Sequence, residues 1–426
     1  MVLAHGIGGR QDLPIPLSFL LAGAALAVLI SFAAVGVMWR DPRFRADRGR
    51  PVPALLQAVA DSPATRVVLR LAGVLGAVAT ITAALLGAGG AANPAPWTVY
   101  VVFWVGLVPL SLLFGPVWRL LNPLRAVHAG LALLSGGRTL ARLPSRVGYW
   151  PAAFGLLAFT WLELVPPDRE EGWALLTWFA VYAITMIVGS TVFGAGFFDK
   201  ADPFEVYSAL IGRLSPLGRR DDGRLVLRNP FDNLAGLTSS PGLVAVVCVM
   251  LGSTAYDGFS RSPWWAVQVQ SGPLPRTLMG SLGLIALVAL VALSYRLCTR
   301  TVGPGAPGAL APSLIPIAVG YLIAHYFTLL LFGGQQAVKL WSDPLATQAD
   351  YLGTRDWVID YQILGDTAQA VIRAGAVVLG HVLGVLAAHD KAVELLPKRR
   401  ALTGQLPLLL LMVFYTVGGL TLLFAT

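Results

Sequence analysis

The sequence predicts an all-α fold, a polytopic integral membrane bundle of about ten transmembrane helices. Of the 426 residues, 56% are hydrophobic and only 12% are charged, about half the charged fraction of a soluble domain. The apolar residues gather in runs of roughly 18–25, the length that crosses the hydrocarbon core of a bilayer. The predicted spans are 15–38, 66–89, 97–118, 147–166, 172–196, 241–259, 276–297, 309–333, 368–389 and 403–425.

The basic residues indicate the orientation. When residues near the end of a span are counted with the adjoining side, the side of the loops after the odd-numbered spans holds 23 of the 31 Lys and Arg residues, the opposite side holds 7, and Arg70 is left inside a span. Cytoplasmic loops carry such an excess, so we expect both termini outside a cell membrane. Because the basic residues lie beside spans, the net charge of +9 indicates no nucleic-acid partner, and the expected partner is the lipid bilayer.

We expect an extracytoplasmic N-terminal segment, 1–14, and a single transmembrane domain, 15–426. Its largest loops are a cytoplasmic one at 198–240 and an extracytoplasmic one at 334–367. Inside the first loop, alternating apolar and polar residues at 224–230 predict a short strand.

The sequence also contains a weak internal repeat. Phe114-Gly115 ends span 3 and Phe193-Gly194 ends span 5, and a helix then opens at Asn122-Pro123 and at Asp202-Pro203. Asn or Asp at the N-cap, followed by Pro, is a typical helix start. A parallel repeat of a two-span unit explains the pattern, and so does chance similarity among apolar helices.

Ionisable residues within spans indicate a candidate functional site, because a charge inside a bilayer is costly. Tyr321, His325 and Thr328 share one helical face of span 8, and Arg373 and His381 lie near one face of span 9. Each histidine is either a structural hydrogen-bonding group or a ligand.

Two carboxylates, Glu163 and Asp257, end spans on the same outer side, where His5 precedes span 1. Each carboxylate is either a site residue or an interfacial group that faces water. Mixed histidine and carboxylate ligands suit Zn, Fe or Mn, and histidine-rich sets suit Cu. We therefore predict a site for one transition metal ion, without diagnostic ligand spacing. The predicted metal ligands are His325, His381, Asp257, Glu163 and His5, and the loop aspartates Asp343, Asp350, Asp356 and Asp360 open to the same side.

Three further expectations concern local structure. Gly333–Gln336 is expected to open the backbone of span 8, and Gly375, Gly380 and Gly384 are expected to allow close helix contact. The cytoplasmic groups His128, His389 and Asp390 are expected to be solvated. No ATP-binding or common hydrolase motif is present.

Three stretches together resemble a known family. They are Ala4-His5-Gly-Ile-Gly-Gly-Arg-Gln-Asp12-Leu-Pro14; Phe204-Glu-Val-Tyr-Ser208 with Arg213-Leu-Ser-Pro216 and Arg224-Leu-Val-Leu-Arg-Asn229-Pro230; and Ala324-His325-Tyr326-Phe327 with Gln335, Gly380-His381 and His389-Asp390. The family is one of polytopic membrane proteins of actinobacteria, usually labelled fenitrothion hydrolase. The resemblance covers nearly the whole chain.

The resemblance implies metal-dependent hydrolysis of an apolar, organophosphate-type ester that partitions into the bilayer. A metal held by His325 and His381 would activate water and polarise phosphorus. Asp257 would be a ligand or a base, and Arg373 would stabilise developing negative charge. Two other classes stay open: a copper-handling protein with His5 as an outer ligand, and a transporter or assembly partner that uses the polar face of spans 8 and 9 as a solute or proton path.

Overall fold

The computed structural model describes residues 13–397, 400 and 402–424, and it confirms the all-α membrane fold. Among these residues, nine helical segments are long and apolar enough to cross a membrane. They are α1 (Leu17–Met38), α3 (Pro63–Leu86), Pro94–Phe114 (α4 Pro94–Trp97, π-helix η2 Thr98–Val105, α5 Leu107–Phe114), α9 (Gly172–Phe193), α13 (Leu243–Ser260), α15 (Arg276–Thr299), Ala306–Trp341 (α16 Ala306–Leu310, η5 Ala311–Ser313, α17 Leu314–Trp341), α18 (Asp366–Leu395) and Thr403–Phe424 (η6 Thr403–Gln405, α19 Leu406–Phe424).

The remaining predicted span, 147–166, corresponds to a shorter apolar helix of 15 residues. A helix needs about 20 residues to cross the hydrocarbon core without tilt or thinning. The shorter helices of the described residues are α2 (Ala54–Asp61), η1 (Gly90–Ala92), α6 (Trp118–Leu121), α7 (Pro123–Ser135), α8 (Trp150–Leu164), η3 (Ala195–Phe197), α10 (Phe198–Ala201), α11 (Pro203–Ile211), η4 (Gly212–Leu214), α12 (Pro230–Ala235) and α14 (Pro263–Ser271).

The chain divides into two compact units. The described part of the first unit is 47–230 and 328–361, and that of the second is 13–46, 231–327 and most of 362–424. Helix α17 contributes residues to both. The predicted single domain, 15–426, and the predicted orientation stay predictions.

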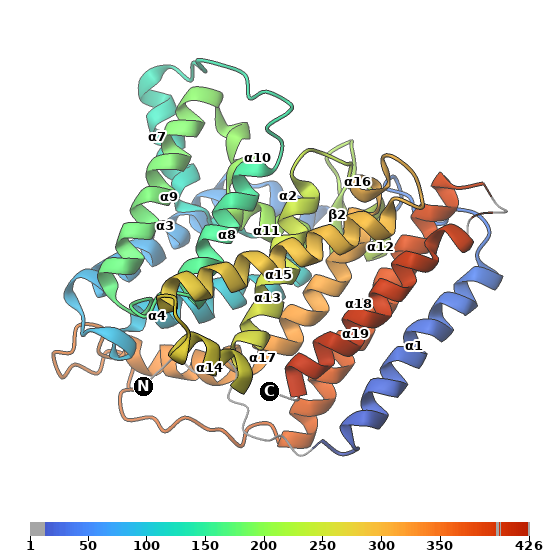
Figure 1. Cartoon of the computed structure of the whole chain (residues 1–426). Helices are drawn as coiled ribbons and strands as arrows, with labels where there is room; N and C mark the ends of the chain where they lie inside the picture. Colours follow the sequence, from blue (N-terminus) through green and yellow to red (C-terminus); the bar gives the residue numbers. More distant parts are fainter. Residues whose placement is uncertain (1–12, 398–399, 401, 425–426) are drawn as a thin grey trace. The chain divides into compact units, whose positions relative to one another are not determined.

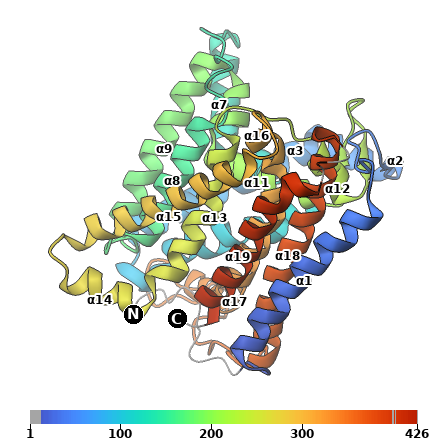
Figure 2. The same ribbon diagram turned by 45° about the vertical axis from the view of Figure 1, so that its right-hand side comes forward.

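The first unit contains the predicted repeat as two matching helix breaks. Helices α5 and α9 end at Gly115 and Gly194, whose φ angles of 79° and 82° lie in the region that favours glycine. A short helix follows each glycine, and the side chains of Asn122 and Asp202 then cap α7 and α11. Helix α7 packs against α9 and α3 (Figures 1 and 2). The same sequence signals therefore build the same local structure twice.

A small antiparallel sheet accompanies these helices, in the order β1-β3-β2. The predicted strand at 224–230 is confirmed as β3 (Leu225–Leu227). Its neighbours are β1 (Arg50–Pro51) and β2 (Leu217–Arg219). These strands are too short to alternate visibly in the sequence, which is why only the central one is predictable.

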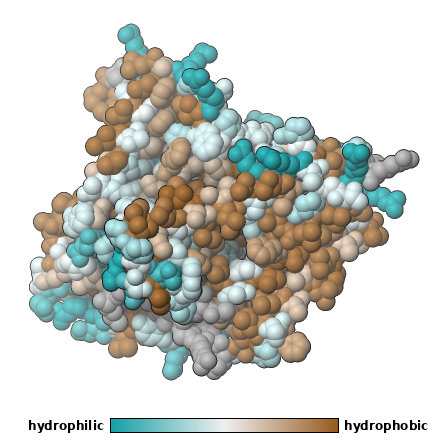
Figure 3. Space-filling model, viewed as in Figure 1, coloured by the Kyte–Doolittle hydropathy of each residue, from teal (hydrophilic) through white to brown (hydrophobic). Residues whose placement is uncertain are grey.

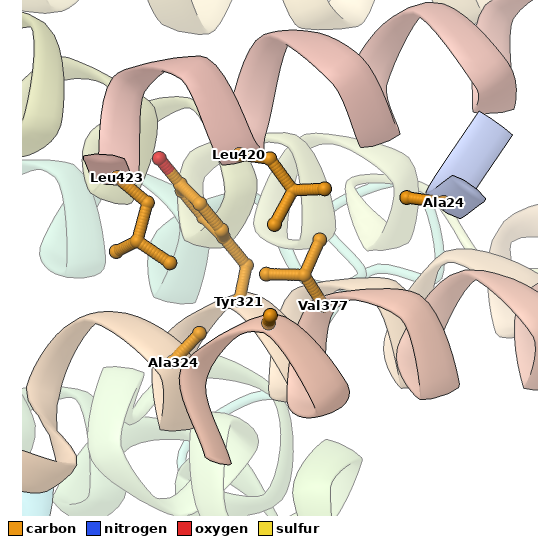
Figure 4. Close-up of a cluster of buried hydrophobic side chains, with 7 residues drawn as sticks. Ala24, Tyr321, Ala324, Val377, Leu420 and Leu423 are labelled. Atoms are coloured by element: carbon orange, nitrogen blue, oxygen red, sulfur yellow. The ribbon is translucent and has the colours of Figure 1, made fainter. Parts of the chain in front are cut away.

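In the second unit, α1, α18 and α19 lie side by side (Figures 1 and 2). Helix α13 packs along α15. A cluster of buried apolar residues joins α1, α17, α18 and α19 around the ring of Tyr321, and the labelled members in Figure 4 converge from these helices. The core of this unit therefore surrounds the helix that carries His325.

The outer faces of these helices are apolar. Large hydrophobic side chains on α1, α15 and α19 are more than half exposed, including Ile30, Leu293 and Leu410. Figure 3 shows hydrophobic residues gathered over the helices and hydrophilic ones mainly at their ends. Such a surface is suited to contact with lipid, because a large apolar surface exposed to water would promote aggregation.

The structure corrects one expectation about glycine and bears out most of another. Helix α17 continues through Gly333–Gln336 to Trp341, so the backbone does not open there. Gly380 and Gly384 do face another helix closely, since a Cβ at these positions would lie within 3 Å of the carbonyl oxygens of Pro316 and Ser313 respectively. A Cβ on Gly375 would have nothing within 4 Å. At 333–336, helix propensity of the flanking residues outweighs two adjacent glycines.

Candidate functional site

His325 and Asp257 form a buried hydrogen-bonded pair in the second unit. His325 lies on α17 and Asp257 near the end of α13, with 2.8 Å between Nε2 and Oδ2. Both side chains are 4% exposed. Because an ionised carboxylate can only accept, Nε2 carries the hydrogen and Nδ1 presents a lone pair. Among the described residues Nδ1 has no hydrogen-bond partner, so the pair offers an oriented base with one open position.

Two arginines flank this pair. Arg261, one turn after Asp257, places Nη2 at 3.1 Å from Oδ1 and compensates the charge of the carboxylate. Arg373 on α18 donates from Nε to the carbonyl of Ala324 at 3.1 Å and from Nη2 to that of Leu423 at 3.2 Å. Its contact with the residue before His325 ties α18 to the site. The structure therefore brings together three of the predicted residues, His325, Asp257 and Arg373.

Tyr321 and His381 each contribute another polar atom without a partner among the described residues. The ring centroid of Tyr321 is 6.1 Å from that of His325, one helical turn away, and its hydroxyl is buried. His381 Nδ1 lies 2.9 Å from the carbonyl oxygen of Val377. Since a carbonyl only accepts, Nδ1 donates and Nε2 is left with a buried, unpartnered lone pair.

A cavity of about 140 Å³ joins these two residues, because both Tyr321 and His381 line it. The rest of its lining comes mostly from apolar side chains of α13, α15 and α19. One water molecule takes about 30 Å³ of liquid volume, so a few waters fit. The second unit therefore contains three buried polar atoms without a partner among the described residues, on His325, Tyr321 and His381, and a cavity that two of these residues line.

The described residues do not provide a complete set of ligands for the predicted metal ion. Among the described residues, no group of three His, Cys, Asp or Glu side chains is placed to hold a metal ion. His325 and His381 each have one nitrogen available, while Asp257 is engaged by His325 and Arg261. His5 lies outside the described residues. Metal binding stays a prediction.

Glu163 belongs to the first unit, and it does not face water. Its residue on α8 is fully buried, and the phenols of Tyr100 and Tyr207 are electrostatic neighbours. Asp257 is only 3% exposed, so it is not an interfacial group that faces water either. The sequence could not predict that either carboxylate is buried, because the neighbouring residues are apolar whether a position faces lipid or the core.

The loop aspartates hold their own loop together. Asp343 accepts hydrogen bonds from the backbone N–H groups of Thr347 and Gln348, at 2.8 and 2.9 Å. Desolvation raises the pKa of this carboxyl, but these bonds together outweigh it and lower the pKa. The hydroxyl of Ser342 is the main cause of the lowered pKa of Asp350. Both carboxylates are therefore committed to turn structure.

His389 and Asp390 are buried, contrary to the expectation of a solvated end. Asp390 accepts from the indole of Trp39 at 2.9 Å and from the backbone N–H of Arg43 at 2.6 Å. His389 contacts the carbonyl of Trp39 through Nε2 and the amide of Gln405 through Nδ1. The two residues fasten the segment after α1 to α18, and no polar atom is left open on the imidazole.

Sequence reasoning missed a second buried polar network, in the first unit. The two N-caps meet, since Asn122 donates to Asp202 at 2.8 Å. Three positions later, Arg125 makes a two-pronged ion pair with Glu205, at 2.8 and 2.6 Å. Asp199 accepts from the same guanidinium at 2.7 Å. The repeated pattern of Asn or Asp, then Pro, then a charged residue two positions on, was the signal in the sequence.

Comparison with known proteins adds no assignment: no family model, no curated protein and no solved structure matches the chain. The resemblance to the fenitrothion hydrolase family stays a prediction.

Proposed function

We propose that this multi-pass membrane protein moves protons, with His325, Tyr321 and His381 as the exchanging groups. The observation that carries the proposal is the set of three buried polar atoms without partners among the described residues: Nδ1 of His325, the hydroxyl of Tyr321 and Nε2 of His381. Buried polar groups are normally hydrogen-bonded, and ionisable groups within membrane helices are characteristic of proton relays in pumps and transporters.

The chemistry requires only proton exchange. A proton that arrives at Nδ1 of His325 produces an imidazolium, which Asp257 stabilises through the 2.8 Å bond to Nε2. The Tyr321 hydroxyl can both donate and accept. Water in the cavity would connect it to Nε2 of His381, which accepts the proton while Nδ1 stays bonded to Val377. Each step breaks one N–H or O–H bond and forms another.

Proton flux into proteoliposomes, driven by a potassium diffusion potential and followed by an internal pH-sensitive dye, tests the proposal. We expect flux in the wild type and a loss of at least tenfold in His325→Gln, which removes the basic nitrogen. His389→Gln is the matched control, because both nitrogens of that buried histidine already have contacts. Absence of flux in the wild type, or equal flux in His325→Gln, would overturn the proposal.

Hydrolysis of an apolar ester is the second candidate, and the orientation of His325 by Asp257 favours it. His325 is held by Asp257 and keeps a nitrogen without a partner among the described residues, which is how an oriented general base is arranged. Release of 4-nitrophenol from a phosphotriester by detergent-solubilised protein, lost in His325→Gln and kept in His389→Gln, would support it. Treatment with a chelator would then show whether the activity needs the metal that the resemblance implies.

A further inference from the structure

A second cavity lies entirely within the first unit and has a different character. Its volume is about 540 Å³, and its lining includes three basic side chains, Arg70, Arg125 and His128, together with Ala195 and Leu133. Arg70 comes from α3, while Arg125, His128 and Leu133 come from α7. Among the described residues, no acidic side chain lines it.

Arg125 is already neutralised. Its guanidinium binds Glu205 and Asp199 and also approaches the carbonyl of Ala195 at 3.4 Å. Asp199 in turn lies 3.4 Å from Arg119. Near the cavity there are thus three guanidinium groups, those of Arg70, Arg119 and Arg125, and two carboxylates, those of Asp199 and Glu205. This balance leaves one positive charge in excess.

Arg70 supplies that excess. Among the described residues it has no ion pair, and its Nε is buried without a hydrogen-bond partner. Its electrostatic neighbours, Arg66 and Arg125, are both positive. Nδ1 of His128 is also buried without a partner in the described part of the chain, so the predicted solvated histidine instead lines the cavity. Two buried nitrogen atoms at this cavity, Nε of Arg70 and Nδ1 of His128, therefore have no hydrogen-bond partner among the described residues.

Arg70 lies well inside α3, away from both ends of the helix. It lies seven residues after the first residue of α3, Pro63, which is about 10 Å along the axis. One turn further, Gly73 is in backbone contact with Leu121, the last residue of α6. Arg70 thus belongs to a helix that is long and apolar enough to cross a membrane, and an uncompensated charge within such a helix is costly.

Exposed leucines border the cavity. Leu133, which lines it, is 85% exposed, and its neighbour Leu134 is 87% exposed. On α3, Val67 and Leu71 flank Arg70 and are each 54% exposed. A ligand that bound here would have its anionic part at Arg70 and His128 and apolar surface beside it.

We propose that this cavity binds a phosphate-bearing anion, and that the headgroup of an anionic phospholipid is the occupant that the bordering leucines favour. Basic pockets between transmembrane helices recognise such headgroups, and a phosphate offers oxygen atoms to a guanidinium and an imidazole at once. The inference stands apart from the proton path, because it uses no residue of the second unit.

The test measures binding of phosphatidylglycerol to purified protein in detergent, by the rise in the unfolding temperature and by native mass spectrometry. We expect binding by the wild type, weakened about tenfold in Arg70→Gln by loss of a charge-assisted hydrogen bond. Arg66→Gln, an exposed arginine one turn earlier on α3, is the matched control and should bind as the wild type does. Unchanged binding by Arg70→Gln would overturn the proposal.

Two comparisons separate the sources of the anion. Phosphatidylcholine should bind more weakly than phosphatidylglycerol, and equal binding would overturn recognition of the charge. Inorganic phosphate should leave the unfolding temperature unchanged. If phosphate acts through Arg70 while phosphatidylglycerol does not, the anion site stands and the lipid is excluded.

A second pair of variants covers the case in which Arg70→Gln fails to fold. Leu133→Glu places a carboxylate at the rim of the cavity, whereas Leu134→Glu places one on the same helix at a residue that does not line it. Both leucines are exposed, so the packing is unchanged. Loss of lipid binding in Leu133→Glu alone supports the site, and equal binding by the two variants overturns it.

Discussion

The Arg125–Glu205 network of the first unit and the His325–Asp257 site of the second are both buried, yet they differ in how completely their hydrogen bonds are made. Both carboxylate oxygens of Glu205 accept from nitrogens of Arg125, and the N-cap residue Asn122 donates to the N-cap residue Asp202. At the second site, Nδ1 of His325 and the hydroxyl of Tyr321 have no partner among the described residues. A satisfied network fixes structure, whereas open positions permit exchange with a proton or ligand.

The largest effect should come from breaking the satisfied network. Glu205→Ala leaves the buried Arg125 with Asp199 as its one remaining carboxylate among the described residues, and breaking a buried ion pair costs about 3–5 kcal/mol of unfolding free energy. Chemical denaturation in mixed micelles measures it. The double variant Arg125→Met with Glu205→Leu should recover most of the loss, since no charge is then left alone. A loss below about 1 kcal/mol in Glu205→Ala would contradict the structural role.

Removal of one hydroxyl in each unit gives the most direct comparison. The Tyr182 hydroxyl donates to Asp202 at 2.7 Å, so Tyr182→Phe should cost roughly 1.5–3 kcal/mol, as for a bond to a charged group. Tyr321→Phe should leave stability nearly unchanged, because its hydroxyl makes no such bond to the described residues. Instead it should reduce the proton flux. Equal destabilisation by the two variants would remove the distinction between the sites.

Close helix packing contributes to holding the second site, beside the ion pair of Asp257 with Arg261. A Cβ on Gly380 would lie 2.7 Å from the carbonyl oxygen of Pro316 and 3.1 Å from Cα of Gly320. Gly380→Ala should therefore destabilise by about 1–3 kcal/mol through overpacking. Gly375→Ala, in open space on the same helix, should be neutral or stabilise by up to about 1 kcal/mol. Thermal unfolding of the two variants checks the difference.

The smallest effect should come from an exposed pair. Arg219 lies 2.6 Å from Asp61, and this hydrogen bond, followed by that from Gln57, lowers the pKa of Asp61 below its ordinary 3.8. A depressed pKa gives stability that is present above the ordinary value and is lost as the pH falls through the lowered one. Asp61→Asn should thus be slightly less stable than the wild type at neutral pH, and this difference in unfolding free energy should vanish in acid. A large difference at neutral pH would show that exposed pairs also stabilise this fold.

The two histidine outcomes show how far sequence reasoning reaches. Placing His325, Asp257 and Arg373 near one another was possible because charged groups in apolar helices must face each other. His389 was misjudged, since its distance from the end of a span says nothing about a loop that folds over it. Its partners, Trp39 and Gln405, lie 350 and 16 residues away in the chain.

The sequence by itself determined the class of protein, because apolar runs of membrane length leave the backbone only the helix as a solution. It also determined the two helix breaks, since glycine and the Asn-Pro and Asp-Pro pairs act within one turn. Only the tertiary structure decided which polar atoms found partners. That outcome depends on contacts between helices far apart in the chain, such as Arg125 with Glu205, and on the space left at Arg70 and between Tyr321 and His381.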